Sequence, residues 1–108
     1  LMLPPDRAAS APARVYVAAF GEKAADVGFA LLDELRGAGV PADTDFRSGT
    51  LKAHLRQADR LGVLYTILLG DDEVGKGIAI LRNMRTKMQE EVVLSQLSSL
   101  LGTRLLGA

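Results

Sequence analysis

The stretch GKGIAILRNMRTK, residues 75–87, carries four basic side chains and no acidic one, in a chain whose formal net charge is zero. It reads as a strand that ends in Arg82, Asn83 and Arg85. A guanidinium is a planar fork of donors that can bond to a guanine edge, and further cations can hold a phosphate backbone. In isolation, the same residues could simply keep an exposed strand end in water. The rest of the sequence has to decide between these two interpretations.

Other kinds of chemistry find little support in the sequence. The absence of cysteine excludes disulfides, thiolate metal sites and a cysteine nucleophile. The one histidine, His54, lies in a basic helical segment with no serine in a sharp-turn context, so we read it as a partly buried or surface histidine. The acids Asp71 to Glu73 could suggest a hard-cation site, but consecutive acids point in different directions and also suit the start of a helical turn. The sequence contains neither of the glycine-rich phosphate-binding motifs G-x-x-x-x-G-K-[ST] and G-x-G-x-x-G. We therefore expect no catalytic and no metal-binding residue.

Charge is balanced over the whole chain, with thirteen basic and thirteen acidic residues, but it is unevenly distributed. Acids dominate residues 22–45, whereas bases dominate residues 47–60 and stand unopposed in residues 76–87. This local polarity suits a local anionic partner rather than indiscriminate nucleic-acid binding. No apolar run approaches the ~20 residues of a membrane span, and the lack of cysteine fits a reducing cytoplasm.

The length of 108 residues is enough for one domain with a single core. Residues 1–13 are rich in proline and alanine and begin with Leu1 rather than methionine. We expect this stretch to be a linker remnant, residues 14–108 to form the domain, and the chain to be an excised fragment.

The first part of the chain alternates strands and helices. RVYVAAF (14–20) and VLYTILLG (63–70) are apolar on both faces, as strands buried on both sides are, and ADTDF (42–46) is a short strand candidate. Helical spacing appears in residues 22–39 and 51–62; in the second helix Leu51, Leu55 and Ala58 share the apolar face. This order predicts parallel strands joined by right-handed crossovers.

The pattern changes after Gly70. Only DDEVGK separates this strand from GIAILRNM, and six residues are too few for a parallel crossover, so the next strand should be antiparallel. TKMQEEVV reads as an edge strand and LSQLSSLLGTRLL as a closing amphipathic helix. The predicted fold is α/β: a mixed five-stranded sheet, with three parallel strands then an antiparallel hairpin, and three helices in a three-layer arrangement.

The hairpin prediction also fixes directions. We expect Ile78 and Ile80 to face the core by the two-residue period of a strand. Glu73 lies in the turn that enters this strand, so we expect Glu73 and Arg82 to meet at the same rim of the sheet.

Three motifs carry a family resemblance. LKAHLRQADRLG resembles S-L-K-K-Q-L-x-x-A-D-K-L-G, LLGDDEV resembles I-G-E-D-E, and ILRNMRT resembles L-K-D-M-x-T. In this order they are similar to the C-terminal anticodon-binding domain of the class II aminoacyl-tRNA synthetases for His, Thr, Pro and Gly, and most similar to the histidine branch. The resemblance runs from Arg14 to about Leu106.

The resemblance implies that the chain holds the anticodon end of a tRNA. Glu73 and Arg82 match an acid and a base that contact anticodon bases in the threonine branch, Asn83 follows the basic residue, and Arg85 lies one step beyond. Loop bases are read along their edges while cations hold the backbone. Candidate phosphate contacts are Lys52, Arg56, Lys76 and Lys87.

Two further positions bear on this site. Lys87 takes the place of a turn glycine, because TKMQ stands where T-G-E-Q is common in the family. Tyr65 and Phe46 could stack on bases, but their apolar, strand-like settings favour the core.

By resemblance, the parent protein is a histidyl-tRNA synthetase, an ATP-dependent ligase that joins histidine to histidine tRNA and works as a homodimer. ATP and magnesium would bind in its catalytic domain, so no cofactor is expected in this fragment. The alternative is a non-catalytic regulatory or protein-interaction domain that reuses the fold; retention of both Glu73 and Arg82 favours the synthetase. A small nucleotide-binding domain is disfavoured because the phosphate loop is absent.

Overall fold

The computed structural model describes residues 14–44 and 50–106. The predicted linker at residues 1–13, Phe46 and the C-terminal residues 107–108 lie outside this part. The elements, in chain order, are β1 (Val15–Phe20), α2 (Glu22–Gly37), β2 (Ala42–Thr44), α3 (Leu51–Leu61), β3 (Tyr65–Gly70), α4 (Asp71–Lys76), β4 (Ile78–Asn83), β5 (Gln89–Val93) and α5 (Leu94–Leu106).

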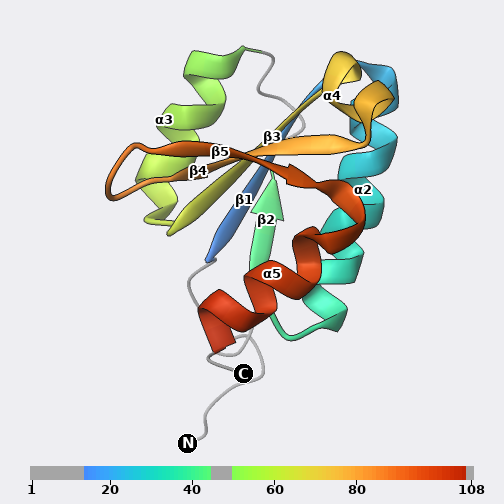
Figure 1. Ribbon diagram of the computed structural model, residues 1–108. Helices are drawn as coiled ribbons and strands as arrows, with labels where there is room; N and C mark the ends of the chain where they lie inside the picture. The colour runs from blue at the N-terminus through green and yellow to red at the C-terminus, as the bar shows by residue number, and fades with distance from the viewer. Residues whose placement is uncertain (1–13, 45–49, 107–108) are drawn as a thin grey trace, which may run out of the picture.

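The strands form one mixed sheet in the order β2-β1-β3-β4-β5 (Figure 1). β1 pairs in parallel with both β2 and β3, whereas β4 is antiparallel to β3 and to β5. The predicted parallel half and antiparallel hairpin are therefore confirmed. The hairpin of β4 and β5 forms one edge of the sheet, and β2 forms the other.

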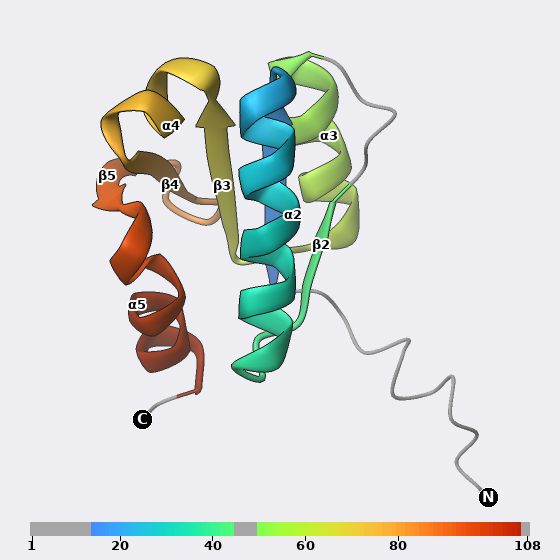
Figure 2. The ribbon, with the colours of Figure 1, turned by 90° about the vertical axis from the view of Figure 1, so that its right-hand side faces the viewer.

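Helices cover both faces of the sheet, which confirms the three-layer arrangement. α2 and α5 lie on one face and α3 lies on the other (Figure 2). The main core fills the first side, where Leu31 and Leu35 of α2 and Leu97 and Leu101 of α5 pack on the strands. A smaller cluster on the second side joins α3 to β1 around Tyr16 and Ala58. α3 therefore covers the β1 part of its face and leaves β4 and β5 more open.

The structure has one helix more than predicted, because DDEVGK folds into the short helix α4 rather than a plain turn. Gly70 precedes the helix, and Glu73 Oε1 accepts a hydrogen bond from the Gly70 amide at 2.9 Å. Gly77 ends the helix in the left-handed region at φ 72°, a conformation that glycine adopts without steric cost. The three acids predicted at this point thus begin a helix, where they complement its dipole.

Two predicted directions were wrong. In β4 it is Ala79 and Leu81 that enter the main core, whereas Ile78 and Ile80 are half-buried on the face that α3 covers only in part. Both sets are apolar, so the two-residue period could not tell which one faces the thicker layer of helices.

In α3 the predicted apolar face was also displaced. Leu51 is 48% exposed, whereas His54, expected to be at most partly buried, is 2% exposed. The His54 Nδ1 lies 2.8 Å from the Tyr16 hydroxyl, and its ring meets Phe20 edge-on at 5.1 Å between centroids. A histidine can enter this core because its polar nitrogen is paired there.

The first turn of α2 depends on a side chain from far along the chain. Gly21, which precedes α2, has φ 110° and offers no side-chain cap. Asp71 of α4 supplies one instead, because its Oδ1 accepts a hydrogen bond from the Ala24 amide at 2.9 Å. A Cβ at position 21 would overlap that carboxylate oxygen, so the contact also requires glycine there. Asp71 thus joins α4 to α2.

We predict that Asp71→Ala lowers the free energy of unfolding by about 0.5–2 kcal/mol, since an unpaired amide replaces a capped one at the α2 N-terminus. Asp71→Asn should lower the free energy of unfolding by less, because its amide oxygen can still accept the hydrogen bond from the Ala24 amide. It should still be less stable than the unmodified chain, because the neutral amide brings no negative charge to the positive end of the helix dipole. Urea unfolding of the variants measures both values. Asp33→Ala is the control, because Asp33 is an exposed carboxylate in the C-terminal half of α2, away from its N-terminus. Equal stability of Asp71→Ala and Asp33→Ala would refute the capping role.

Candidate nucleic-acid interface

The turn between β4 and β5 is organised by Asn83. Its backbone amide donates to the Met88 carbonyl at 2.8 Å, and its carbonyl accepts from the Lys87 amide at 2.8 Å. Its side-chain Oδ1 accepts from the amides of Arg85 at 2.9 Å and Thr86 at 3.0 Å. The oxygen of the Asn83 side chain is thus engaged within the turn, and the amide nitrogen is the group that faces outward for a ligand.

Lys87 adopts a backbone conformation that glycine favours. Its φ is 66°, and among the described residues it is the one non-glycine residue with a positive φ. A side chain in this region is strained by the contact of its Cβ with the backbone. The hairpin geometry is therefore kept without glycine, and the exposed turn gains a cation.

Arg82 points to the opposite face of the sheet from Asn83. It lies across from Thr66 of β3 and Gln89 of β5, on the face where α3 packs on β1. Its side chain is half-buried, and its Nε–H is shielded from solvent without a hydrogen-bond partner in the described part of the chain. A buried donor without an acceptor costs about 1–3 kcal/mol. The rest of the guanidinium belongs to a half-buried side chain at the part of this face that α3 leaves open.

Glu73 and Arg82 do not meet at one rim, and that prediction was wrong. α4 follows the carboxyl end of β3, and β4 then returns antiparallel to β3 (Figure 1). Arg82 therefore pairs with Thr66, near the amino end of β3. The four residue steps of β4 from Ile78 to Arg82 rise by about 13 Å, and Glu73 lies in α4, before the start of this strand. The Glu73 carboxylate meanwhile accepts from the Gly70 amide. An RNA loop that touches both residues has to extend along β4.

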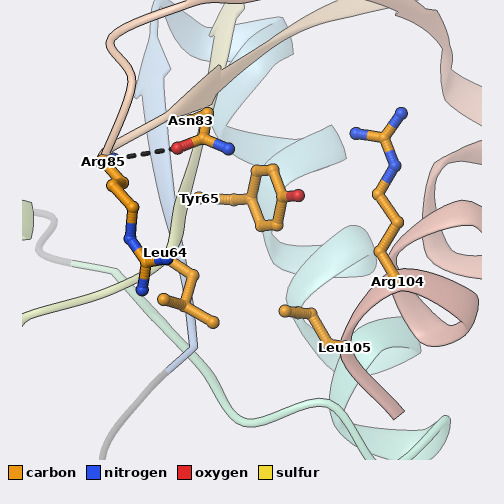
Figure 3. A pocket seen from close by; sticks show the side chains of 6 residues that line it. All are labelled: Leu64, Tyr65, Asn83, Arg85, Arg104 and Leu105. Atoms are coloured by element: carbon orange, nitrogen blue, oxygen red, sulfur yellow. Dashed lines mark hydrogen bonds between the residues drawn. The ribbon is translucent and has the colours of Figure 1, made fainter. Parts of the chain in front are cut away.

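A cavity of about 190 Å³ opens beside Asn83 on the other face of the sheet, and Figure 3 shows its lining. The lining residues are Leu64, Tyr65, Asn83, Arg85, Arg104 and Leu105. Arg85 and Arg104 lie on opposite sides of the Tyr65 ring. The Arg104 Cζ is 5.9 Å from the ring centroid, within cation–π range.

Arg104 is held in place by Glu90 of β5, whose Oε1 lies 3.1 Å from its guanidinium nitrogen. Burial lowers the pKa of Arg104, but the Glu90 carboxylate raises it by hydrogen bonding and charge, and the net shift is upward. Arg104 is therefore a permanent cation at the cavity.

Sequence reasoning placed Tyr65 in the core and did not single out Arg104. Tyr65 does pack against the main core, but it is only half-buried and also lines the cavity. The available signal for Arg104 was its position as the one charged residue of the last helix.

The structure does not gather the predicted phosphate contacts into one patch. Lys52 and Arg56 lie on the exposed face of α3, Lys76 is exposed in the last turn of α4, and Lys87 lies in the hairpin turn. Only Asn83 and Arg85, of the predicted site residues, line the same cavity. Within residues 14–44 and 50–106, no group of histidine, cysteine or acidic side chains could hold a metal ion, and no helix is long and apolar enough to cross a membrane.

We predict that two substitutions of Lys87 differ in their effect on stability. Lys87→Gly should stabilise the chain by about 0.5–1 kcal/mol, because relief of the strained conformation exceeds the entropy cost of glycine. Lys87→Ala retains the Cβ and should bring no such gain. Urea unfolding of both variants compares them directly, and a Lys87→Ala chain as stable as Lys87→Gly would show that the turn is not strained.

Comparisons with known proteins show the family to which this chain belongs. The family model described as "Anticodon binding domain" matches residues 14–104. The histidine–tRNA ligase of Acetivibrio thermocellus is 42% identical over 85 residues, which cover 79% of this chain and 20% of that protein. The ligase of a Geobacillus species is 42% identical over 90 residues, which cover 83% of this chain and 21% of that protein. The chain thus spans about a fifth of these relatives.

Solved structures show the same likeness. Histidyl-tRNA synthetase from S. aureus superposes with a TM-score of 0.79 at 31% identity, over 83% of this chain and 23% of that one. The enzyme from a Nostoc species gives a TM-score of 0.80 at 26% identity, over 88% of this chain and 23% of that one. The RNA-binding domain of threonyl-tRNA synthetase from Cryptosporidium parvum, at 24% identity and a TM-score of 0.75 over 85% of this chain and 23% of that one, has the same fold.

Proposed function

Since this chain belongs to the anticodon-binding domain family, we propose that it holds the anticodon loop of histidine tRNA as one segment of a histidine–tRNA ligase. Its sequence identity of about 40% to such ligases supports this specificity. The longer protein would activate histidine with ATP and magnesium in a catalytic domain, as a homodimer in the cytoplasm. This chain supplies no residue to that reaction; its part is to bind and orient the RNA.

The single observation that carries the proposal is the match of residues 14–104 to the family described as "Anticodon binding domain". Loop bases are read when they are splayed out and hydrogen bonded along their edges. Arg82 presents a half-buried donor fork at the open part of the α3 face, which suits an edge that carries acceptors, as guanine does. Lys87 and Arg85, exposed in the adjoining turn, would meet the backbone phosphates beside it.

Glu73 has a different part in the proposal. One of its carboxylate oxygens accepts from the Gly70 amide. The other can accept from a base amino or imino group, so Glu73 would contact the loop at the far end of β4 from Arg82. Lys76, in the same short helix, would hold the phosphate there.

We predict that Arg82→Ala weakens binding of the cognate anticodon stem-loop by about 1–3 kcal/mol and relaxes discrimination at one anticodon position. Lys87→Ala should instead weaken all stem-loops about equally and lower the salt slope by ~1, because a phosphate contact carries no sequence information. Fluorescence anisotropy with a cognate stem-loop and a base-substituted one, at low and moderate salt, measures both effects.

Lys23→Gln is the control for the loss of a positive charge, because Lys23 is exposed in the first turn of α2. If Arg82→Ala weakens the cognate and substituted loops equally, Arg82 is one more phosphate contact and does not read a base. If the unmodified chain binds neither loop, the fold serves a regulatory or protein-interaction role instead.

A further inference from the structure

The end of β4 presents two sets of ligand-binding groups, one on each face of the sheet. Neighbouring residues of a strand point to opposite faces. Arg82 lies across from Thr66 on the α3 face, whereas Asn83 lies across from Tyr65 on the face of α2 and α5. The cavity beside Tyr65 is therefore separate from the position of Arg82.

The polar lining of this cavity consists mainly of hydrogen-bond donors. Asn83 has its Oδ1 engaged by the amides of Arg85 and Thr86, which leaves its side-chain nitrogen toward the cavity (Figure 3). The guanidinium of Arg85 is exposed and has no hydrogen-bond or ion-pair partner in the described part of the chain. That of Arg104 is tied to Glu90 on one side. Such a set of donors favours an anionic ligand or one rich in acceptors.

The remaining walls of the cavity are apolar. Tyr65 contributes its ring, and Leu64 and Leu105 contribute aliphatic side chains. Arg104, at 5.9 Å from the ring centroid, is at the outer limit of a cation–π contact and covers the ring only loosely. An aromatic surface of this kind, next to cations, is typical of sites where single-stranded bases stack.

The size of the cavity limits the ligand to a small unit. Its volume of about 190 Å³ is below the roughly 300–1,000 Å³ of pockets that enclose a whole drug-sized molecule. One base with its phosphate partly outside fits this limit, and the exposed Arg85 lies where that phosphate would emerge.

We propose that this cavity is a second RNA subsite, which takes one nucleotide of the bound tRNA on the sheet face opposite Arg82. The inference rests on the proposed function. The base lies against Tyr65, the Asn83 amide donates to its edge, and Arg85 holds its phosphate. The RNA backbone reaches both faces by crossing the β4–β5 turn, where Lys87 is exposed. An acidic peptide would use the two arginines and the amide donor but not the ring, so the ring is what favours RNA.

The test compares variants of the 108-residue chain in binding a labelled anticodon stem-loop. Tyr65→Leu should weaken binding about 5- to 100-fold, because it removes the stacking surface. Tyr65→Phe keeps the ring and should change the affinity less than about 3-fold. Arg85→Gln should weaken binding about 3- to 10-fold, whereas Lys23→Gln, at the opposite end of the sheet, should leave it unchanged.

A second measurement keeps the test valid if Tyr65→Leu unfolds. The side-chain Nε–H signals of Arg85 and Arg104 in the ¹⁵N-labelled chain should shift when the stem-loop is added, and hexaglutamate should not shift them at the same concentration. If hexaglutamate shifts them and RNA does not, the cavity takes a protein ligand and the proposal is overturned.

The outcomes also separate this proposal from the proposed function. If Arg82→Ala weakens binding while Tyr65→Leu behaves like Lys23→Gln, the chain binds the anticodon loop but the second subsite does not exist, because Tyr65 has no part in the proposed function. If the unmodified chain does not bind the stem-loop at all, the proposed function fails and the subsite with it.

Discussion

The short connection between β3 and β4 is the constraint on which the rest of the candidate interface depends. Six residues, folded as α4, join the two strands, and a parallel crossover needs a dozen or more. The chain must therefore reverse at Gly77, and β4 returns beside β3 in the opposite direction. This reversal places Arg82 and Asn83 next to Thr66 and Tyr65, at the far end of the sheet from Glu73. The turn that joins β4 to β5 therefore also lies at this end of the sheet.

The same connection explains which parts of the fold could be predicted from sequence. The length of DDEVGK determined the antiparallel pairing, and the doubly apolar runs at 14–20 and 63–70 determined the buried parallel strands. The facing of β4 could not be predicted, because Ile78 and Ile80 are as apolar as Ala79 and Leu81, and the choice between them depends on which face receives two long helices. His54 was misplaced because its partner, Tyr16, lies thirty-eight residues away.

The candidate site was predicted less completely, for a related reason. Motif resemblance identified Arg82 and Asn83, but it carried no information on strand register. Register is what sets Asn83 across from Tyr65, and the packing of α5 is what brings Arg104 over the Tyr65 ring. The hairpin is also locally unfavourable, since the Arg82 Nε–H lacks an acceptor among the described residues and Lys87 has a left-handed backbone. Strain of this kind persists where the surrounding structure enforces it, and it is concentrated at functional sites.

The carboxylate that bridges α4 and α2 has a consequence for the order in which the domain assembles. The acceptor of the Ala24 amide is Asp71, which lies forty-seven residues later in the chain. During synthesis from the N-terminus, β1 and α2 emerge first, but α2 has no cap of its own and β1 lacks its β3 neighbour. Contacts so distant in sequence close late, after the entropy of the intervening loop has been lost. The first half of the domain therefore completes its structure only when β3 and Asp71, the first residue of α4, have been made.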